Sequence, residues 1–263
     1  MGKYLRSMKK YILLLCCLCV TYSSLQANSL TLYDLTKNIQ SVRTRSMGDA
    51  YTAIAEGEGA IHSNPAGLSY PGGIYTYQYF DYDGTYNRRN QGYFFYTRPF
   101  GYSKISIEDL TGNTATLTTF GYGRQGKNGV SWGINYKAVE STIDGINYEG
   151  WSSDFGILMK LTPSLSLGGV VKDIYAKSIS VPTTAQVGIS GSHKKNSFIW
   201  SADLAYDDLT HKEINPKYGF ELSLTDSLAI RSGYSDRTVN AGLNLHAMSL
   251  QFDLGMSNDL DDG

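Results

Sequence analysis

The feature that most constrains this chain is a regular alternation of apolar and polar residues from residue 129 onward. The last run shows it most clearly and reads MSLQFDLGM over residues 248–256. Successive side chains of a β-strand point to opposite faces, so each run predicts a strand with one apolar and one polar face. About thirteen runs can be counted between residues 74 and 256. The pattern is weakest in the first third, where Thr, Gly and Asn interrupt it.

The length of the runs distinguishes a membrane barrel from a soluble β-sandwich, because both folds alternate. The runs have about nine to eleven residues, the length a tilted strand needs to cross hydrocarbon, whereas globular strands average about five or six. Tight connections alternate with longer ones, notably residues 140–150 and 207–215. We therefore predict a transmembrane antiparallel β-barrel over residues 73–257, followed by a polar tail, residues 258–263.

The first 27 residues have the composition of an export signal. Basic residues between Lys3 and Lys10 precede an apolar stretch, residues 11–20, that is too short to span a bilayer as a helix. Cleavage after Ala27 removes all three cysteines, which excludes disulfide and metal–thiolate chemistry in the mature chain. It also removes four of the 23 basic residues and none of the 24 acidic ones, so the formal charge falls from −1 to −5. This charge argues against a nucleic-acid partner.

Residues 28–72 lack long alternation and are rich in small residues, so we do not expect them to form barrel wall. Residues 46–55 have the spacing of a short helix with small residues on one side. The following Asn-Pro-Ala-Gly sequence predicts a turn. In it, Pro65 holds Asn64 extended and Gly67 permits the chain to reverse before the first strand.

One segment, RSMGDAYTAIAEGEGAIHSNPAGLSY at residues 45–70, resembles the N-terminal signature of the FadL-like outer-membrane transporters and the related PorV and PorQ proteins. Residues 132–141, 153–174 and 228–257 extend the resemblance over most of the mature chain. The resemblance implies a barrel of about fourteen strands with an N-terminal hatch in the lumen, here residues 28–72. The matching motif residues are Asn64, Pro65, Ala66 and Gly67.

The resemblance also implies two functions, which the motif does not separate. In the FadL branch, hydrophobic molecules cross the outer membrane, whereas the PorV branch serves protein secretion. The expected partners are therefore outer-membrane lipid with either hydrophobic small molecules or secretion-system proteins. Related chains continue through one more strand, so the odd strand count predicts a homologue that lacks the last barrel strand.

Polar residues at alternate strand positions are expected to line the lumen as a mixed-charge network. These residues are Lys137, Asp154, Lys172, Asp203, Glu221, Arg231, His246 and Asp253. A hydrolase site built from His246, Asp253, Asp203 and Ser249 is an alternative, but every such barrel has inward polar residues. We therefore predict no catalytic residues and no cofactor. The four histidines are scattered, which predicts no metal site.

Overall fold

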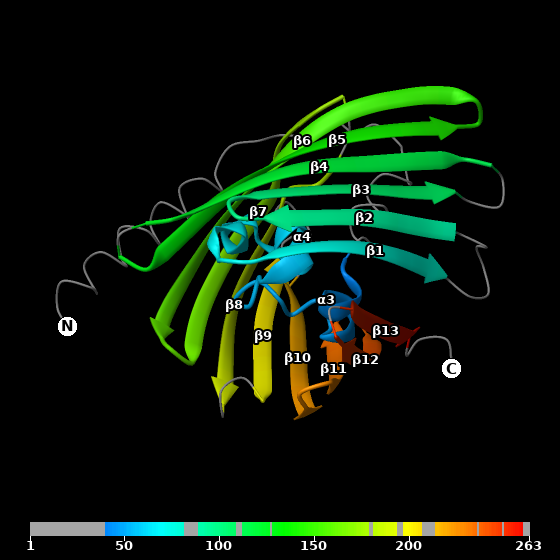
Figure 1. Cartoon of the computed structure of the whole chain (residues 1–263). Coiled ribbons are helices and arrows are strands. Elements are labelled where there is room, and N and C mark those ends of the chain that lie inside the picture. The colour runs from blue at the N-terminus through cyan, green and yellow to red at the C-terminus, as the bar shows by residue number, and fades with distance from the viewer. Residues whose placement is uncertain are drawn as a thin grey trace.

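The protein forms a rolled β-sheet that surrounds its own N-terminal segment (Figure 1). The computed structural model describes residues 40–81, 89–108, 112–126, 128–178, 181–193, 197–206, 214–235, 237–248 and 250–259. The expected export signal, the first part of the expected hatch, Ser249 and residues 260–263 lie outside these ranges. Within them, thirteen strands form one sheet in sequence order, and every neighbouring pair is antiparallel. The predictions of a β-barrel and of thirteen readable strands are confirmed.

The strand bounds follow the predicted runs closely. They are β1 (Gly73–Asp81), β2 (Arg89–Thr97), β3 (Phe100–Glu108), β4 (Thr114–Gln125), β5 (Val130–Ile143), β6 (Ile146–Thr162), β7 (Leu165–Lys177), β8 (Thr184–His193), β9 (Phe198–Tyr206), β10 (Ile214–Thr225), β11 (Leu228–Ser235), β12 (Thr238–Ala247) and β13 (Leu250–Asp259). β13 thus extends two residues into the segment expected to be a polar tail.

The prediction of a long connection over residues 140–150 is wrong. β5 and β6 continue to a two-residue turn at Asp144 and Gly145, whose φ angles are 51° and 77°. Positive φ at both positions is what a type I′ hairpin turn requires, and Asp-Gly is a strong signal for it. The polar residues that interrupt the pattern here lie at the ends of two long strands and not in a loop.

The helices are short and lie in the N-terminal segment. They are α3 (Val42–Ser46), η1 (Gly57–Gly59), α4 (Ala60–Ser63) and η2 (Pro65–Ser69). The prediction of a helix over residues 46–55 is wrong, because α3 ends at Ser46 and is followed by turns in which Gly48 and Asp49 have positive φ. None of the helices within the described ranges is long and apolar enough to cross a membrane.

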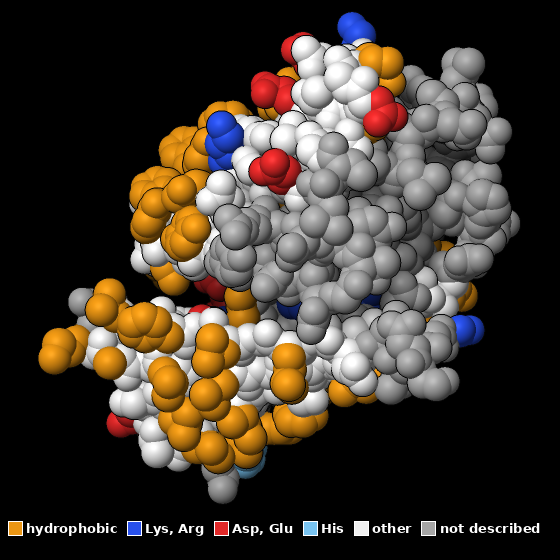
Figure 2. All heavy atoms as spheres, turned by 90° about the vertical axis from the view of Figure 1, so that its right-hand side faces the viewer, with side chains coloured by type: hydrophobic (Ala, Val, Ile, Leu, Met, Phe, Trp, Pro, Cys, Tyr) orange, Lys and Arg blue, Asp and Glu red, His pale blue; other side chains and the backbone are white. Residues whose placement is uncertain are grey.

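The outer surface of the barrel carries apolar and aromatic side chains, which form the orange bands in Figure 2. Aromatic rings of neighbouring strands pair on this surface, as in Tyr122 with Trp132 and Tyr136 with Trp151, with centroids 5.9 and 5.8 Å apart. Ile134 points outward between these two pairs and is 48% exposed. This surface therefore forms an apolar band that suits the hydrocarbon of a membrane. Its Tyr and Trp rings are amphipathic and suit the membrane–water interface.

Substituting Ile134→Arg places a cation within this lipid-facing band. We expect the free energy of unfolding to fall by about 2–4 kcal/mol, as for charges near the bilayer midplane. Glu140→Arg, at an outward position that already carries a charge, is the control and should change little. Urea unfolding in phospholipid vesicles measures both variants, and equal stabilities would contradict the assignment of this band to lipid.

Candidate functional site

The candidate site is the barrel lumen together with the segment that fills it. We call residues 40–72 the hatch. Between residues 40 and 70 the hatch is shielded almost completely, and only Glu56 is largely exposed. Its two ends contact different parts of the wall: α3 packs on β11–β13, and η2 packs on β4–β6.

Glycines on the inward face of the wall let the hatch backbone lie directly against the strands. A Cβ atom at Gly133 would lie 2.2 Å from the carbonyl oxygen of Pro65, and one at Gly219 would lie 2.2 Å from that of Met47. The wall glycines that a Cβ would press into the hatch are Gly101, Gly121, Gly123, Gly133, Gly156, Gly168, Gly219, Gly233, Gly242 and Gly255. They form two tracks, on β3–β7 and on β10–β13. Side chains at these positions would displace the hatch.

Asn64 joins the hatch motif to the wall. Its backbone is extended, with φ −161°, as expected for a residue before proline. The side-chain Oδ1 accepts from the Ala66 amide at 3.1 Å, while Nδ2 donates to the carbonyl oxygens of Thr52 at 2.9 Å and Ile157 at 3.0 Å. One buried amide thus caps η2 and links the hatch to β6.

Gly67 has a different role from the expected one. Its φ is not positive, so it does not act by adopting a left-handed conformation. A Cβ atom at Gly67 would instead lie 1.6 Å from the carbonyl oxygen of Ala55. The motif therefore needs glycine because two hatch segments cross at this point. The predicted turn is a single 3-10 helix, η2.

Two arginines and two carboxylates connect α3 to the wall strands β10, β11 and β13. Arg43 donates to both carboxylate oxygens of Glu221, at 2.8 and 3.0 Å. Arg231 donates to the same carboxylate at 2.6 Å and also to Asp253. Glu221, Arg231 and Asp253 were expected in the lumen lining, but Arg43 was not singled out. This network holds the N-terminal part of the hatch.

A second network lies on β5–β7. The Lys137 ammonium is 2.7 Å from Asp154 and 2.6 Å from Asp173, and all three side chains are buried. Asn135 donates to the Ile61 carbonyl oxygen at 2.6 Å and to Asp154 at 3.1 Å, which links this network to the hatch. Lys137 and Asp154 are among the predicted lumen residues, whereas Asp173 was missed.

Asp203 binds the hatch backbone from β9. Its carboxylate accepts from the Thr52 amide at 2.9 Å and from the Gln186 side chain at 2.7 Å. Gln186 in turn donates to the Asp49 carbonyl oxygen at 3.1 Å. A charged acceptor of a backbone amide is stronger than a neutral one, so this contact fixes the middle of the hatch.

Of the residues of the alternative hydrolase site, Ser249 lies outside the described residues, and Asp203 and Asp253 are engaged in separate contacts. His246 is exposed near the end of β12, on the same face of the strand as the buried Asn240. Asp253 is bonded to Arg231, Asn244 and Gln251. Asp203 is engaged with the hatch on a different strand, and no group of three His, Cys, Asp or Glu within the described ranges could hold a metal ion.

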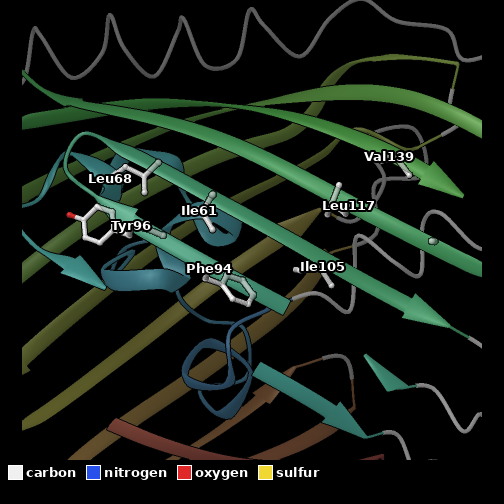
Figure 3. Close-up of a cluster of buried hydrophobic side chains, with 9 residues drawn as sticks. Ile61, Leu68, Phe94, Tyr96, Ile105, Leu117 and Val139 are labelled. Atoms are coloured by element: carbon white, nitrogen blue, oxygen red, sulfur yellow. The ribbon is translucent and has the colours of Figure 1, made fainter. Parts of the chain in front are cut away.

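An apolar strip lies on the other part of the lumen wall. Phe94, Ile105, Leu117 and Val139 point inward from four successive strands, β2–β5 (Figure 3). The last three are direct cross-strand neighbours. They are buried and pack in one cluster with apolar hatch residues, including Ile61 and Leu68. The hatch is therefore held by polar contacts around most of the wall, but it presents an apolar surface to this strip.

His62 lies where the hatch meets the strip. Burial, together with the nearby Lys172 and Lys137 ammonium groups, lowers the pKa of His62 to about 3. The ring is therefore neutral. It contacts the Ser103 hydroxyl at 2.9 Å and the edge of Phe94, with ring centroids 5.6 Å apart. The pKa of His62 in the folded protein is lower than its value of about 6.5 in the unfolded chain. The packing of the neutral ring therefore stabilises the hatch fully above about pH 6.5, and this contribution is lost as the pH falls below that value.

A pocket of about 370 Å³ opens where the hatch leads into β1. Glu56, Tyr70, Ile74, Tyr96 and Lys160 contribute to its lining. The Lys160 ammonium lies 4.4 Å from the centre of the Tyr70 ring, and the Tyr96 hydroxyl donates to the Tyr70 carbonyl oxygen. Burial raises the pKa of Tyr70 to about 12, so its hydroxyl stays protonated. The lining of the pocket thus includes neutral aromatic rings, one acidic side chain, Glu56, and one basic side chain, Lys160.

Comparisons with known proteins identify the fold. No protein-family model and no curated protein matches the sequence. The Pseudomonas putida toluene transporter TodX matches the structure with a TM-score of 0.61 over 81% of this chain and 90% of that chain, at 12% identity. The monoaromatic hydrocarbon channel CymD matches with a TM-score of 0.57 over 81% of this chain and 91% of that chain, also at 12% identity. The chain therefore shares the β-barrel fold of these two proteins.

Replacing Asn64→Ala should loosen the hatch, because three backbone groups lose their partner at a cost of about 1–3 kcal/mol. Residues 28–263 contain no cysteine, so Thr52→Cys, at a fully buried position, serves as the probe in protein refolded without residues 1–27. We expect a water-soluble maleimide to label the introduced thiol at least about tenfold faster when Asn64→Ala is added.

The control is Asn147→Ala in the same Thr52→Cys background. Asn147 lies in the exposed β5–β6 hairpin, where its side-chain oxygen accepts from the Thr142 hydroxyl at 2.8 Å. Its replacement should leave the labelling rate unchanged. Equal rates for the Asn64 and Asn147 variants would show that Asn64 does not hold the hatch.

Proposed function

We propose that this barrel carries hydrophobic molecules across the outer membrane without changing them chemically. The observation that carries the proposal is the apolar strip of Phe94, Ile105, Leu117 and Val139, which faces the lumen over an apolar part of the hatch. Barrel interiors are usually polar, because the apolar face of the strands is needed outside. A continuous apolar lining is unfavourable in a channel filled with water. It therefore favours an apolar cargo.

The arrangement of contacts supports a route along the strip. Displacing the hatch from β9–β13 breaks the charged contacts of Arg43, Asp203 and Glu221. Displacing it from β2–β5 exposes the apolar strip and breaks hydrogen bonds between neutral groups, such as those of Asn135 with Ile61 and of Ser131 with Ser69, which are weaker than charged ones. An apolar cargo can cover that surface and offset the cost of exposing it. The hatch therefore opens on the side of the strip while its N-terminal end stays attached.

Four described side-chain oxygen atoms on the strands that bear the strip, or next to them, have no hydrogen-bond partner. They belong to Gln78, Thr119, Asn135 and Ser141, and all four residues are buried. A passing molecule with one hydroxyl group can donate to them. We therefore include uncharged cargo with a single donor, such as an aromatic alcohol, beside pure hydrocarbons.

A role in protein secretion, as in the PorV branch, is a second proposal. It rests on the sequence resemblance at residues 45–70 alone, and co-purification of a secretion-system protein from outer membranes would support it. Delivery to that membrane through a cleaved signal, residues 1–27, belongs to both proposals.

Val139→Thr tests the route, because it adds one hydroxyl to the strip at nearly constant shape. Placing an unpaired hydroxyl in an apolar contact costs about 1–3 kcal/mol, so we expect toluene uptake to fall about tenfold. The matched control is Val187→Thr on the outer face of β8, where the side chain is 44% exposed. Uptake is measured with cells that lack other hydrocarbon channels. Equal uptake by the two variants would exclude the strip as the route.

A further inference from the structure

The pocket at the start of β1 carries the further inference. Four separate segments build it: Glu56 and Gly57 of the hatch, residues 70–74, Tyr96 of β2 and Lys160 of β6. The space beside Gly57 is open, because a Cβ atom there would meet nothing within 4 Å. A volume of about 370 Å³ is near the lower end of the range for small-molecule sites, so the pocket suits a ligand with a single ring.

The pocket lies at the end of the barrel where the connections are tight. Lys160 precedes the two-residue turn between β6 and β7, and Tyr96 precedes the two-residue turn between β2 and β3. Connections at the other end are longer, as over residues 82–88 and 207–213. Bacterial barrels place their short turns in the periplasm and their long loops outside the cell, so this pocket opens toward the periplasm.

Two tyrosine rings and an isoleucine give the pocket an apolar lining. The Tyr96 hydroxyl donates to the Tyr70 carbonyl oxygen, which fixes the two residues relative to each other. Ile74 of β1 adds an aliphatic side chain to the same lining. Phenol rings pack favourably against the face or the edge of another aromatic ring. The lining therefore favours a ligand that contains such a ring.

The charges at the pocket favour an anion. The Glu56 carboxylate lies 3.7 Å from the Arg43 guanidinium, so its charge is already matched within the hatch. The Lys160 ammonium lies instead over the Tyr70 ring, 4.4 Å from the ring centre. Its three N–H groups can donate to a carboxylate placed beside that ring.

Arg98 supplies a second positive charge at the margin of the pocket. Its amide donates to the carbonyl oxygen of Gly72, a lining residue, at 3.4 Å. Its guanidinium lies close enough to the Tyr96 hydroxyl for an electrostatic interaction. Two cations beside an apolar lining are complementary to a molecule that joins a ring to a carboxylate, because such cations donate charge-assisted hydrogen bonds.

We propose that this pocket binds a small carboxylate with one aromatic ring, and that the bound molecule holds the hatch closed. The ring lies against Tyr70, Tyr96 and Ile74, and Lys160 donates to the carboxylate. The ligand contacts the hatch on one side and β1, β2 and β6 on the other, so it must leave before the hatch moves away from these strands. Its charge is disfavoured at the apolar strip, which distinguishes this ligand from the transported cargo.

4-Azidobenzoate tests the site directly, because it joins the ring and the carboxylate to a photoreactive group. The purified protein is irradiated with it in detergent micelles, and the labelled residues are located by mass spectrometry. We expect the label on the pocket lining. Benzoate should displace it at a concentration at least about tenfold lower than benzylamine or toluene, which share the ring but lack the carboxylate.

Lys160→Met keeps a long side chain at the pocket but removes its charge. We expect the benzoate concentration that displaces the label to rise about tenfold in this variant. Lys104→Met is the matched control, because Lys104 is exposed between the buried Ser103 and Ile105 on β3 and should not affect the pocket. Circular dichroism shows whether both variants are folded, and labelling of the unaltered protein decides the proposal if Lys160→Met is not.

The effect on the hatch is measured with the Thr52→Cys probe. At ten times its dissociation constant, benzoate should slow maleimide labelling of the introduced thiol about tenfold, because only the closed state binds it. The same benzoate concentration should have little effect when Lys160→Met is added.

Four results would overturn the proposal. They are a photolabel outside the pocket lining, displacement by toluene or benzylamine as effective as by benzoate, equal benzoate affinities of the two lysine variants, and maleimide labelling that benzoate does not slow. None of these measurements involves transport. Their failure therefore leaves the uptake prediction for Val139→Thr unaffected, and failure of that prediction leaves this site unaffected.

Discussion

The need to pair every backbone polar group within hydrocarbon governs this structure. A strand that crosses a membrane has no water to bond its amides, so it must be flanked on both sides by other strands. The chain meets this need by the simplest topology, in which each strand pairs with the strands before and after it in sequence. Side chains then divide by position, because alternate residues face lipid and lumen.

The lumen has two chemically different parts, which differ in the side chains that the wall places against the hatch. Around β9–β13, Arg43, Asp203 and Glu221 hold the hatch through charge-assisted hydrogen bonds. Along β2–β5 the apolar strip packs against Ile61 and Leu68 of the hatch, and the hydrogen bonds to the hatch join neutral groups, such as Asn135 and the Ile61 carbonyl oxygen. The glycine tracks bring the backbone of the hatch close enough for both kinds of contact. A segment held in this way can open on one side while remaining attached on the other.

Much of the wall could be predicted from sequence, because the period of two follows directly from strand geometry. The β5–β6 hairpin was missed because polar residues beyond the membrane band resemble a loop, although Asp144-Gly145 is a hairpin signal. The apolar strip was also missed. Its strands carry apolar residues on both faces, as in Tyr93-Phe94-Phe95, so alternation fades where the lumen itself is apolar. The hatch was the least predictable part, because its fold depends on contacts with distant strands, such as Asn64 with Ile157. Nothing in the sequence reports a contact such as that of Arg43 with Glu221, across 178 positions.

Transport as proposed requires that the hatch lie in the lumen and move to admit cargo. Ser69 of the hatch and Ser131 of β5 are both buried, with their hydroxyl oxygens 2.7 Å apart. The double variant Ser69→Cys, Ser131→Cys should form a disulfide, because residues 28–263 contain no other cysteine to compete. Toluene uptake should then be blocked and should return when a reductant opens the bond. Absence of the disulfide, or full uptake through the locked protein, would contradict a hatch that sits in the lumen and must move.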